Sequence, residues 1–406
     1  MKRPDRESAV EKRFYSRRML RAAIVCAAAL AVIVLCLLLE RSESVSEFCS
    51  RYISRPIVWL MGHISSVFPF SLFEIFVFAA VAAALTLVVL FIIYCAGGFP
   101  RRGASYVTVL AAVALCVGAV YTLCTGFNYY RAEAPLPMAE NDEYGKEDYA
   151  QVAELFFEDL TALLEKAEID GNGNLVSPYS FDELNDVIAE EFKRLDDEYF
   201  GGYYTSYTPE AKLMASSELM SELHLIGITF SPLGEANLNA GVPVCDLVST
   251  TAHELMHAKG VMRESEANLV SYWLLATSDN DFLRLCGYLE LTSDMFMLTD
   301  TERHEYWAQR LTECRYDDVR GYSSRYWSQY TALRRISGFF NDIYLAINGQ
   351  GGTESYNEGS QTEITFTPVY DDEGNPVYDE SGGQIFESEI VAYSQIHRFM
   401  AEYFLG

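Results

Sequence analysis

The sequence predicts a mainly helical α+β protein in which three N-terminal transmembrane helices precede one large domain. Three observations lead to this fold class. Three long apolar runs lie within the first 126 residues, and helical periodicity recurs through the rest of the chain. Residues 1–126 carry 13 Lys/Arg and 7 Asp/Glu (net +6), whereas residues 127–406 carry 17 and 50 (net −33). A chain of 406 residues is long enough for both parts.

The predicted membrane domain covers residues 22–126 and follows a basic cytoplasmic N-terminus at residues 1–21. Its apolar runs occupy residues 22–39, 75–96 and 104–126. Because roughly 20 apolar residues form a helix that crosses the hydrocarbon core, each run predicts a transmembrane helix. A cleaved signal peptide is the competing interpretation of the first run, but no small-residue cleavage site follows it at Glu40.

The distribution of basic residues predicts the orientation in the membrane. Lys and Arg cluster in residues 1–21 and again at Arg101 and Arg102, between the second and third runs. Because basic loops stay in the cytoplasm, we expect a multi-pass protein of the cell membrane with residues 127–406 outside the cytoplasm. Residues 52–70 mix Ile, Trp and Phe with serines, which predicts an amphipathic segment on the outer membrane surface.

The charge of residues 127–406 narrows the partners that this domain can have. A net charge of −33 repels the phosphates of nucleic acid and bare anionic membrane, so we expect neither as its partner. The lipid bilayer around the three apolar runs is the expected membrane partner. The cysteines of the acidic domain are Cys245, Cys286 and Cys314, and three cysteines are too few for a disulfide framework.

The stretch Thr251–Gly260 contains the pattern H-E-x-x-H at His253, Glu254 and His257. On a helix, residues four apart lie on one face, so the two imidazoles can bind one metal ion. Glu254 lies about 100° round the helix from His253, beside the ion, where a general base for a zinc-activated water belongs. The pattern therefore predicts a catalytic Zn²⁺ site.

A catalytic zinc ion takes three protein ligands, so a third ligand is needed. Gly260 can end the helix by adopting a positive φ, and a second helix can then begin near Arg263. On that helix Glu264 and Asn268 share a face, and Glu264 is the predicted third ligand with Glu266 as the alternative. The Asn268 amide is predicted to hold the second nitrogen of a histidine ligand.

The remaining domain elements follow from periodicity and turn signals. A strand at residues 224–230 precedes the metal-binding helix, and we expect it to be an edge strand beside that helix where an extended substrate can pair. Residues 351–385 are Gly-rich and acidic, and they predict a hairpin or a mobile insertion. Helices are expected at residues 149–167, 180–199, 281–297, 306–311, 322–348 and 387–405.

Several short motifs together resemble a bacterial membrane-protein family catalogued as domain of unknown function 3810. They are Gly126–Arg131 after the third run, His253–His257 with Gly260, Glu264–Asn268, Asn341–Leu345 with Asn348–Gln350, and Ser355–Tyr356. The resemblance implies membrane spans joined to a zincin-like metallopeptidase domain. The E-x-x-A-N element is also similar to the third-ligand helix of other glutamate-type zincins, which supports Glu264. Leu269 departs from the family, which tends to have Phe there.

These observations predict a membrane-anchored zinc metallopeptidase that cleaves a peptide or protein substrate outside the cytoplasm. Glu254 would act as the general base, while Tyr344 and His304 are candidates for stabilising the oxyanion. The alternative is a non-catalytic membrane receptor or scaffold with a structural metal site. Because such a site has no need of Glu254, the complete motif favours the enzyme. The motif lies in polar sequence far beyond the third run, which argues against proteolysis inside the membrane.

Overall fold

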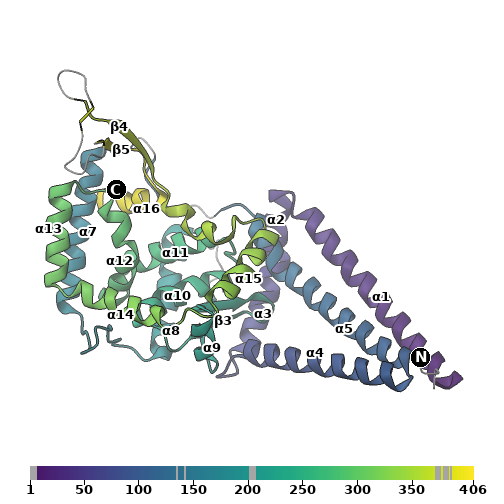
Figure 1. The fold of residues 1–406 in the computed structure, drawn as a ribbon. Coiled ribbons are helices and arrows are strands. Elements are labelled where there is room, and N and C mark those ends of the chain that lie inside the picture. Colours follow the sequence, from purple (N-terminus) through teal and green to yellow (C-terminus); the bar gives the residue numbers. More distant parts are fainter. Residues whose placement is uncertain are drawn as a thin grey trace.

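A computed structural model describes residues 7–133, 136–140, 143–200, 207–370, 376–377, 384 and 386–406. A fan of long helices projects from a helical domain, and the N-terminus lies at the far tip of the fan (Figure 1). The C-terminus lies on the domain (Figure 1). The protein is therefore mainly helical, as predicted.

Among the described residues, three helices are long and apolar enough to cross a membrane, and they match the three predicted runs. They are α1 (Ala9–Leu39), α4 (Leu72–Gly97) and α5 (Pro100–Tyr121), the last continuing through η2 (Thr122–Gly126) into α6 (Phe127–Tyr130). Each helix extends beyond the run that predicted it. The first six residues of the basic N-terminus lie outside the described part.

The segment between the first two long helices is amphipathic, as expected for residues 52–70. It folds as α2 (Glu43–Cys49), η1 (Ser50–Ser54) and α3 (Arg55–Ser65). On α3, Val58 and Gly62 are buried against the rest of the molecule, whereas Leu60 and Ile64 are exposed. This spacing leaves one apolar face of α3 on the protein surface.

The domain packs its helices around one apolar core. Its largest fully buried side chains include Trp273, Phe156, Phe157, Tyr288 and Phe399. The helices are α7 (Lys146–Lys166), α8 (Phe181–Leu195), η3 (Asp196–Phe200), α9 (Ser217–Glu222), η4 (Ser231–Leu233), α10 (Val244–Ala258), α11 (Glu264–Ala276), α12 (Asp281–Phe296), α13 (Thr301–Glu313), α14 (Tyr316–Ser328), α15 (Arg334–Ile347), η5 (Gly352–Ser360) and α16 (Gln395–Leu405).

A small sheet lies beside α10. Its strands are β1 (Lys212–Met214), β2 (Gly227–Phe230) and β3 (Glu235–Asn239), in the order β1-β3-β2. β3 runs parallel to β1 and antiparallel to β2, with Ile228 opposite Asn237. β2 is thus an edge strand of this sheet and contacts α10, as predicted, although it begins at Gly227 rather than at residue 224.

Two predicted helices differ from the structure. Residues 322–348 form the end of α14 and all of α15 instead of one helix, because α14 packs on α13 while α15 packs on η5. Residues 387–392 belong to β5 (Phe386–Ala392), which pairs antiparallel with β4 (Glu363–Pro368), so only the second half of the predicted C-terminal helix is helical. The hairpin expected in the acidic segment is present, but residues 371–375 and 378–383 lie outside the described part.

A buried ion pair joins the sheet to the start of α4. Lys212 Nζ lies 2.6 Å from Glu235 Oε1. The two oxygens of Glu235 also accept the backbone N–H groups of Leu72 and Phe73, at 3.1 and 2.8 Å. A carboxylate at this position satisfies free donors of the first helical turn and complements the helix dipole. The domain therefore holds the beginning of a long apolar helix directly.

Candidate metal centre

The two histidines of the motif lie on one face of α10, as their spacing predicts. Their ring centroids are 4.5 Å apart. The helix ends at Ala258, and Gly260 turns the chain with φ +94°, a conformation that favours glycine. α11 then begins at Glu264, with Arg263 as its N-cap. The sharp turn returns the first residue of α11 to the histidine face of α10.

Glu264 meets both histidines. Its Oε2 atom lies 3.2 Å from His253 Nε2 and 3.2 Å from His257 Nε2. The ligand atoms of these three residues all lie within 4.8 Å of one another. Burial opposes ionisation of Glu264, but the charge of His257 and the close approach of both imidazoles outweigh it and lower the pKa of this carboxyl. Glu264 is therefore an ionised carboxylate, the form that a metal ligand needs.

The donor set is oriented as a metal site requires. His257 Nδ1 donates to the carbonyl oxygen of Val261 at 2.6 Å, so Nε2 is the nitrogen that faces Glu264 and that a bound cation would take in place of its proton. Within the described part of the chain, Glu264 Oε2 is buried without a partner of good hydrogen-bond geometry. A buried carboxylate oxygen facing two imidazole nitrogens is an arrangement that a cation would satisfy. The three residues fit a metal ion.

Glu254 lies beside this cluster and against the edge strand. Thr229 Oγ1 donates to Glu254 Oε2 at 2.7 Å. Opposite the same side chain stands Gly227, where an added Cβ would lie only 2.5 Å from Glu254 Cγ. Burial raises the pKa of Glu254, although the two histidines lower it. A raised pKa suits a carboxylate that must accept and later release a proton.

The alternative ligand, Glu266, points elsewhere. Its carboxylate lies 3.1 Å from Arg131 Nη2 and 3.4 Å from Arg263 Nε. Arg131 also donates to the carbonyl of Gly260 at 3.2 Å. Glu266 therefore ties the turn between α10 and α11 to the segment that follows α6, and the geometry favours Glu264 as the ligand.

Asn268 does not make the contact that its spacing predicted. Its Nδ2 donates to the carbonyl of Tyr356 at 2.9 Å. The second nitrogen of His257 is held by Val261, and His253 Nδ1 has no hydrogen-bond partner among the described residues. The amide therefore anchors η5 to the site instead of orienting a histidine.

Tyr356 is a site residue to which the sequence assigned no role. Its ring stacks near that of His253, with centroids 6.4 Å apart and planes at 25°. Burial and then the negative charge of Glu264 raise the pKa of Tyr356, and Asn341 offers its hydroxyl a hydrogen bond. The sequence signal was the Ser355–Tyr356 piece of the family resemblance, which carried no geometry. The structure brings a neutral phenol to the metal cluster.

The two residues predicted to stabilise an oxyanion lie in different places. The Tyr344 hydroxyl is 2.8 Å from the hydroxyl of Tyr121 and 2.8 Å from that of Tyr129. Burial and the charge of Glu264 raise the pKa of Tyr344, so it is near the cluster but engaged with the third long helix. The ring of His304 lies against that of Phe296, with centroids 4.5 Å apart and planes tilted by 43°. The helix that carries His304, α13, packs on α7 and α14.

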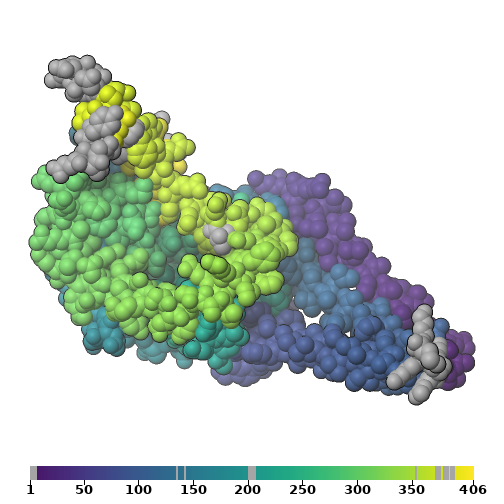
Figure 2. Space-filling model, viewed as in Figure 1, coloured from purple at the N-terminus to yellow at the C-terminus, as the bar shows by residue number. Residues whose placement is uncertain are grey.

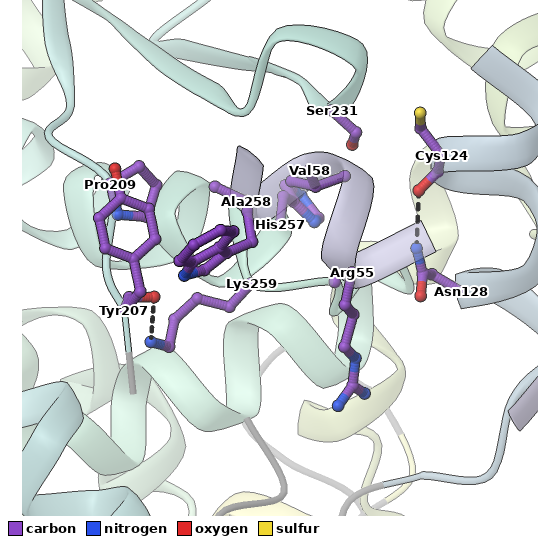
Figure 3. A pocket seen from close by; sticks show the side chains of 12 residues that line it. Arg55, Val58, Cys124, Asn128, Tyr207, Pro209, Ser231, His257, Ala258 and Lys259 are labelled. Atoms are coloured by element: carbon purple, nitrogen blue, oxygen red, sulfur yellow. Dashed lines mark hydrogen bonds between the residues drawn. The ribbon is translucent and has the colours of Figure 1, made fainter. Parts of the chain in front are cut away.

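A small cavity lies between His257 and the segments α3 and α6. The side chains that line it surround His257 and the end of α10 (Figure 3). Arg55 and Val58 come from α3, and Asn128 comes from α6 (Figure 3). Lys259 donates to the carbonyl of Tyr207 at 3.1 Å, and burial lowers the pKa of Lys259 to about 8. His257 thus lies directly behind the surface formed by α3 and the end of the third long helix.

Comparison with known proteins identifies a family but no characterised relative. No curated protein and no solved structure matches the chain. A family model described as protein of unknown function (DUF3810) matches residues 50–360. This range begins after α1 and ends with η5, so it contains the metal cluster, Tyr356 and α15. Because the match covers most of the chain, the protein belongs to this family, DUF3810.

Proposed function

We propose that this protein is a membrane-anchored zinc metallopeptidase that hydrolyses peptide bonds on the extracytoplasmic side of the cell membrane. The observation that carries the proposal is the convergence of His253, His257 and Glu264 within 4.8 Å, with Glu254 buried next to them. A structural metal site has no use for a second, non-ligating carboxylate beside its three ligands. A hydrolytic site needs such a group as its base.

Zinc is the ion that the donor set favours. Two imidazole nitrogens and one carboxylate oxygen form one of the ligand sets of catalytic zinc, which keeps a further position open. Calcium and magnesium prefer sites made of oxygen ligands alone. The site residues would therefore be His253, His257 and Glu264.

In the proposed hydrolysis of a peptide bond, Glu254 and Tyr356 would have separate roles. A bound zinc ion supplies a Lewis acid, which lowers the pKa of a water to about 7 and polarises the scissile carbonyl. Glu254, held in place by Thr229, accepts the proton of the attacking water and passes it to the leaving amine. The Tyr356 phenol is the group that we propose for hydrogen bonding to the oxyanion. Tyr344 fits this role less well because its hydroxyl is shared with two other tyrosines.

The free edge of β2 is the observation that favours a polypeptide as the substrate. Asn239 N donates to Ile226 O at 2.8 Å, so Ile226 is hydrogen-bonded to β3. Because only every second residue of an antiparallel strand bonds to the neighbouring strand, the N–H and C=O groups of Gly227 and Thr229 point away from β3. Both residues also contact Glu254. An extended peptide that added to this edge as a further strand would pass beside the general base.

The membrane placement rests on the apolar helices and on the basic residues that flank them. Arg101 and Arg102 lie in the first turn of α5, just after its link to α4, so the positive-inside rule predicts that this end of the two helices is cytoplasmic and that the domain is outside. Reporter fusions after Gly98 and after Gly406 should then report opposite sides of the membrane. Reports from the same side would contradict this topology.

The test of the activity is the nearly isosteric change Glu254→Gln in the full chain. It removes the base and leaves the three proposed ligands untouched, so zinc content and melting temperature should stay as in the parent. Cleavage of a broad peptide library should fall by roughly 10²–10⁴-fold. Glu218→Gln changes an exposed acid on α9 and is the matched control, expected to behave as the parent.

A structural metal site gives a different result in the same experiment. Cleavage and zinc content would both be unchanged in Glu254→Gln, while His257→Ala would lose the metal and melt at a lower temperature. That pair of results would refute hydrolysis and favour the receptor or scaffold.

A further inference from the structure

Helix α15 presents an apolar stripe to its surroundings. Five large apolar side chains of this helix are exposed, and they follow one another at helical spacing, so they lie on one face. These residues are Ile336 (53% exposed), Phe339 (61%), Phe340 (63%), Ile343 (42%) and Ile347 (73%). Isolated apolar residues on a surface are ordinary, but five on one helix face form a contiguous patch.

The opposite side of α15 approaches η5 through the partly buried Asn341, the exposed Asp342 and the buried, apolar Leu345. Asn341 faces Tyr356, Asp342 approaches Gly352, and Leu345 is the fully buried residue of the helix. A helix on the surface of a soluble domain has the reverse arrangement, with its apolar stripe inside. Five large apolar side chains of α15 nevertheless point outward, so this face lacks an apolar partner among the described residues.

The position of α15 identifies what it contacts. Tyr344 hydrogen-bonds to Tyr121 and Tyr129, on the last turns of the third long helix. Just beyond α15, Gly349 has φ +78°, and an added Cβ there would lie 2.9 Å from the Tyr130 hydroxyl. Figure 1 shows α15 beside the domain end of α5. Tyrosines gather where a membrane helix leaves the hydrocarbon region, so α15 lies at that depth.

A second amphipathic helix lies at the same end of the third long helix as α15. In Figure 2 the yellow-green segment that contains α15 lies next to the blue and purple long helices. The amphipathic helix α3 contacts η2, at the same end of the third long helix, and exposes Trp59, Leu60 and Ile64. Two helices with outward apolar faces therefore flank the end of one apolar helix.

We propose that α15 is an interfacial helix whose apolar face is buried among the acyl chains of the outer leaflet, with the phospholipid bilayer as its partner. The proposal rests on the membrane anchoring proposed above but not on the hydrolytic activity. A large net negative charge on the domain disfavours a purely electrostatic attachment, whereas an apolar stripe beside a membrane helix needs no charge. Arg334 and Arg335 at the start of α15 suit the headgroup layer.

This position has a consequence for the metal centre. Asn341 of α15 contacts Tyr356 on one side of the cluster, while Val58 of α3 lines the cavity behind His257 on the other. If both helices lie in the leaflet surface, the metal cluster lies immediately above it. Polypeptide segments that emerge from the same leaflet are then the substrates best placed to reach Glu254.

The proposal is tested by fluorescence quenching in lipid nanodiscs with the full chain. F340W adds a tryptophan in the middle of the stripe to the four native tryptophans. Y306W is the control, because Tyr306 is 52% exposed on α13, which packs on α7 and α14. Phosphatidylcholine brominated near the start of its acyl chains should quench most of the fluorescence that F340W adds, and aqueous iodide should quench that of Y306W instead.

Quenching of the F340W signal by iodide and not by brominated lipid would overturn the proposal. If F340W fails to fold, I343W tests the same stripe one turn along the helix. A second copy of the chain is the competing occupant of the stripe. Cross-linking of two F340C chains through residue 340, together with no quenching by brominated lipid, would assign the stripe to self-association instead.

Discussion

The contact between Gly227 and Glu254 gives the sharpest test of how this site is built. An alanine Cβ at residue 227 would lie 2.5 Å from Glu254 Cγ and 2.6 Å from its Oε1. Nonbonded carbon atoms prefer separations of about 3.5–4.0 Å, so Gly227→Ala must move the Glu254 side chain by about 1 Å. A displacement of that size in a catalytic group can lower turnover by roughly 10²-fold. Crowding at a buried site should also lower stability by about 1–3 kcal/mol.

The assay measures peptide cleavage per bound zinc ion, with zinc content determined on the same sample. The three proposed ligands lie on α10 and α11 and not on β2, so Gly227→Ala should retain its zinc while turnover falls. Gly171→Ala is the matched control, because a Cβ there meets nothing within 4 Å. Unchanged turnover in Gly227→Ala would show that the position of Glu254 does not set the rate. Loss of zinc together with turnover would show that strand and ligands are one rigid unit, contrary to this reasoning.

Three further predictions concern the third metal ligand, the buried ion pair of the sheet and a buried histidine. Glu264→Ala should greatly weaken zinc binding measured by titration, whereas Glu266→Ala should keep it, and the opposite result would exchange their roles. Lys212→Met leaves the charge of the Glu235 carboxylate buried without its ion-pair partner, so the free energy of unfolding measured with denaturant should fall by about 3–5 kcal/mol. Adding Glu235→Leu removes that buried charge, so the double variant should regain part of the lost free energy of unfolding. Burial lowers the pKa of His397 to about 4, so the unfolded chain binds the extra proton first and stability falls as pH drops from about 6.5 to 4. Over that interval the free energy of unfolding of the parent should fall by about 3 kcal/mol relative to that of His397→Gln. If the difference in free energy of unfolding between the two proteins does not change with pH, the lowered pKa of His397 is contradicted.

The parts of the site that are close together in sequence were predictable. His253 and His257 share a helix face because they are four residues apart, and Gly260 is the one residue of the turn that adopts a positive φ at little cost. Glu264 then follows within a single tight turn. Local spacing and one backbone requirement are enough to bring these three proposed ligands together.

The parts that depend on distant segments were not predictable. Asn268 hydrogen-bonds to the carbonyl of Tyr356, which is 88 residues away in the sequence, and no local sequence pattern predicts such a contact. The central strand β3 was also missed, because Glu235 and Asn237 are polar and yet fully buried. Glu235 is stabilised there by Lys212 and by the start of α4, which only the folded chain brings together. Polar residues satisfied by remote partners look like turn residues in the sequence alone.

The same distant contacts make a prediction about substrates. If α3 and α15 lie in the leaflet surface, a peptide attached to a lipid by a short spacer is held near the cluster at an effective concentration in the roughly millimolar range. At micromolar total peptide, it should be cleaved about 100-fold faster than the same peptide free in solution.

The length of the spacer then measures the height of the site above the membrane. A proline-rich spacer of about 20 residues is semi-rigid and extends about 60 Å, so it should carry the peptide past the cluster and remove most of the advantage of a spacer of about 5 residues. Glu254→Gln measures background cleavage for both peptides. Equal or faster cleavage with the long spacer would place the cluster far from the bilayer, even if α15 itself is embedded. Faster cleavage with the short spacer would instead mean that the apolar faces of α3 and α15 set which polypeptides reach Glu254, because they fix the distance between the metal cluster and the leaflet.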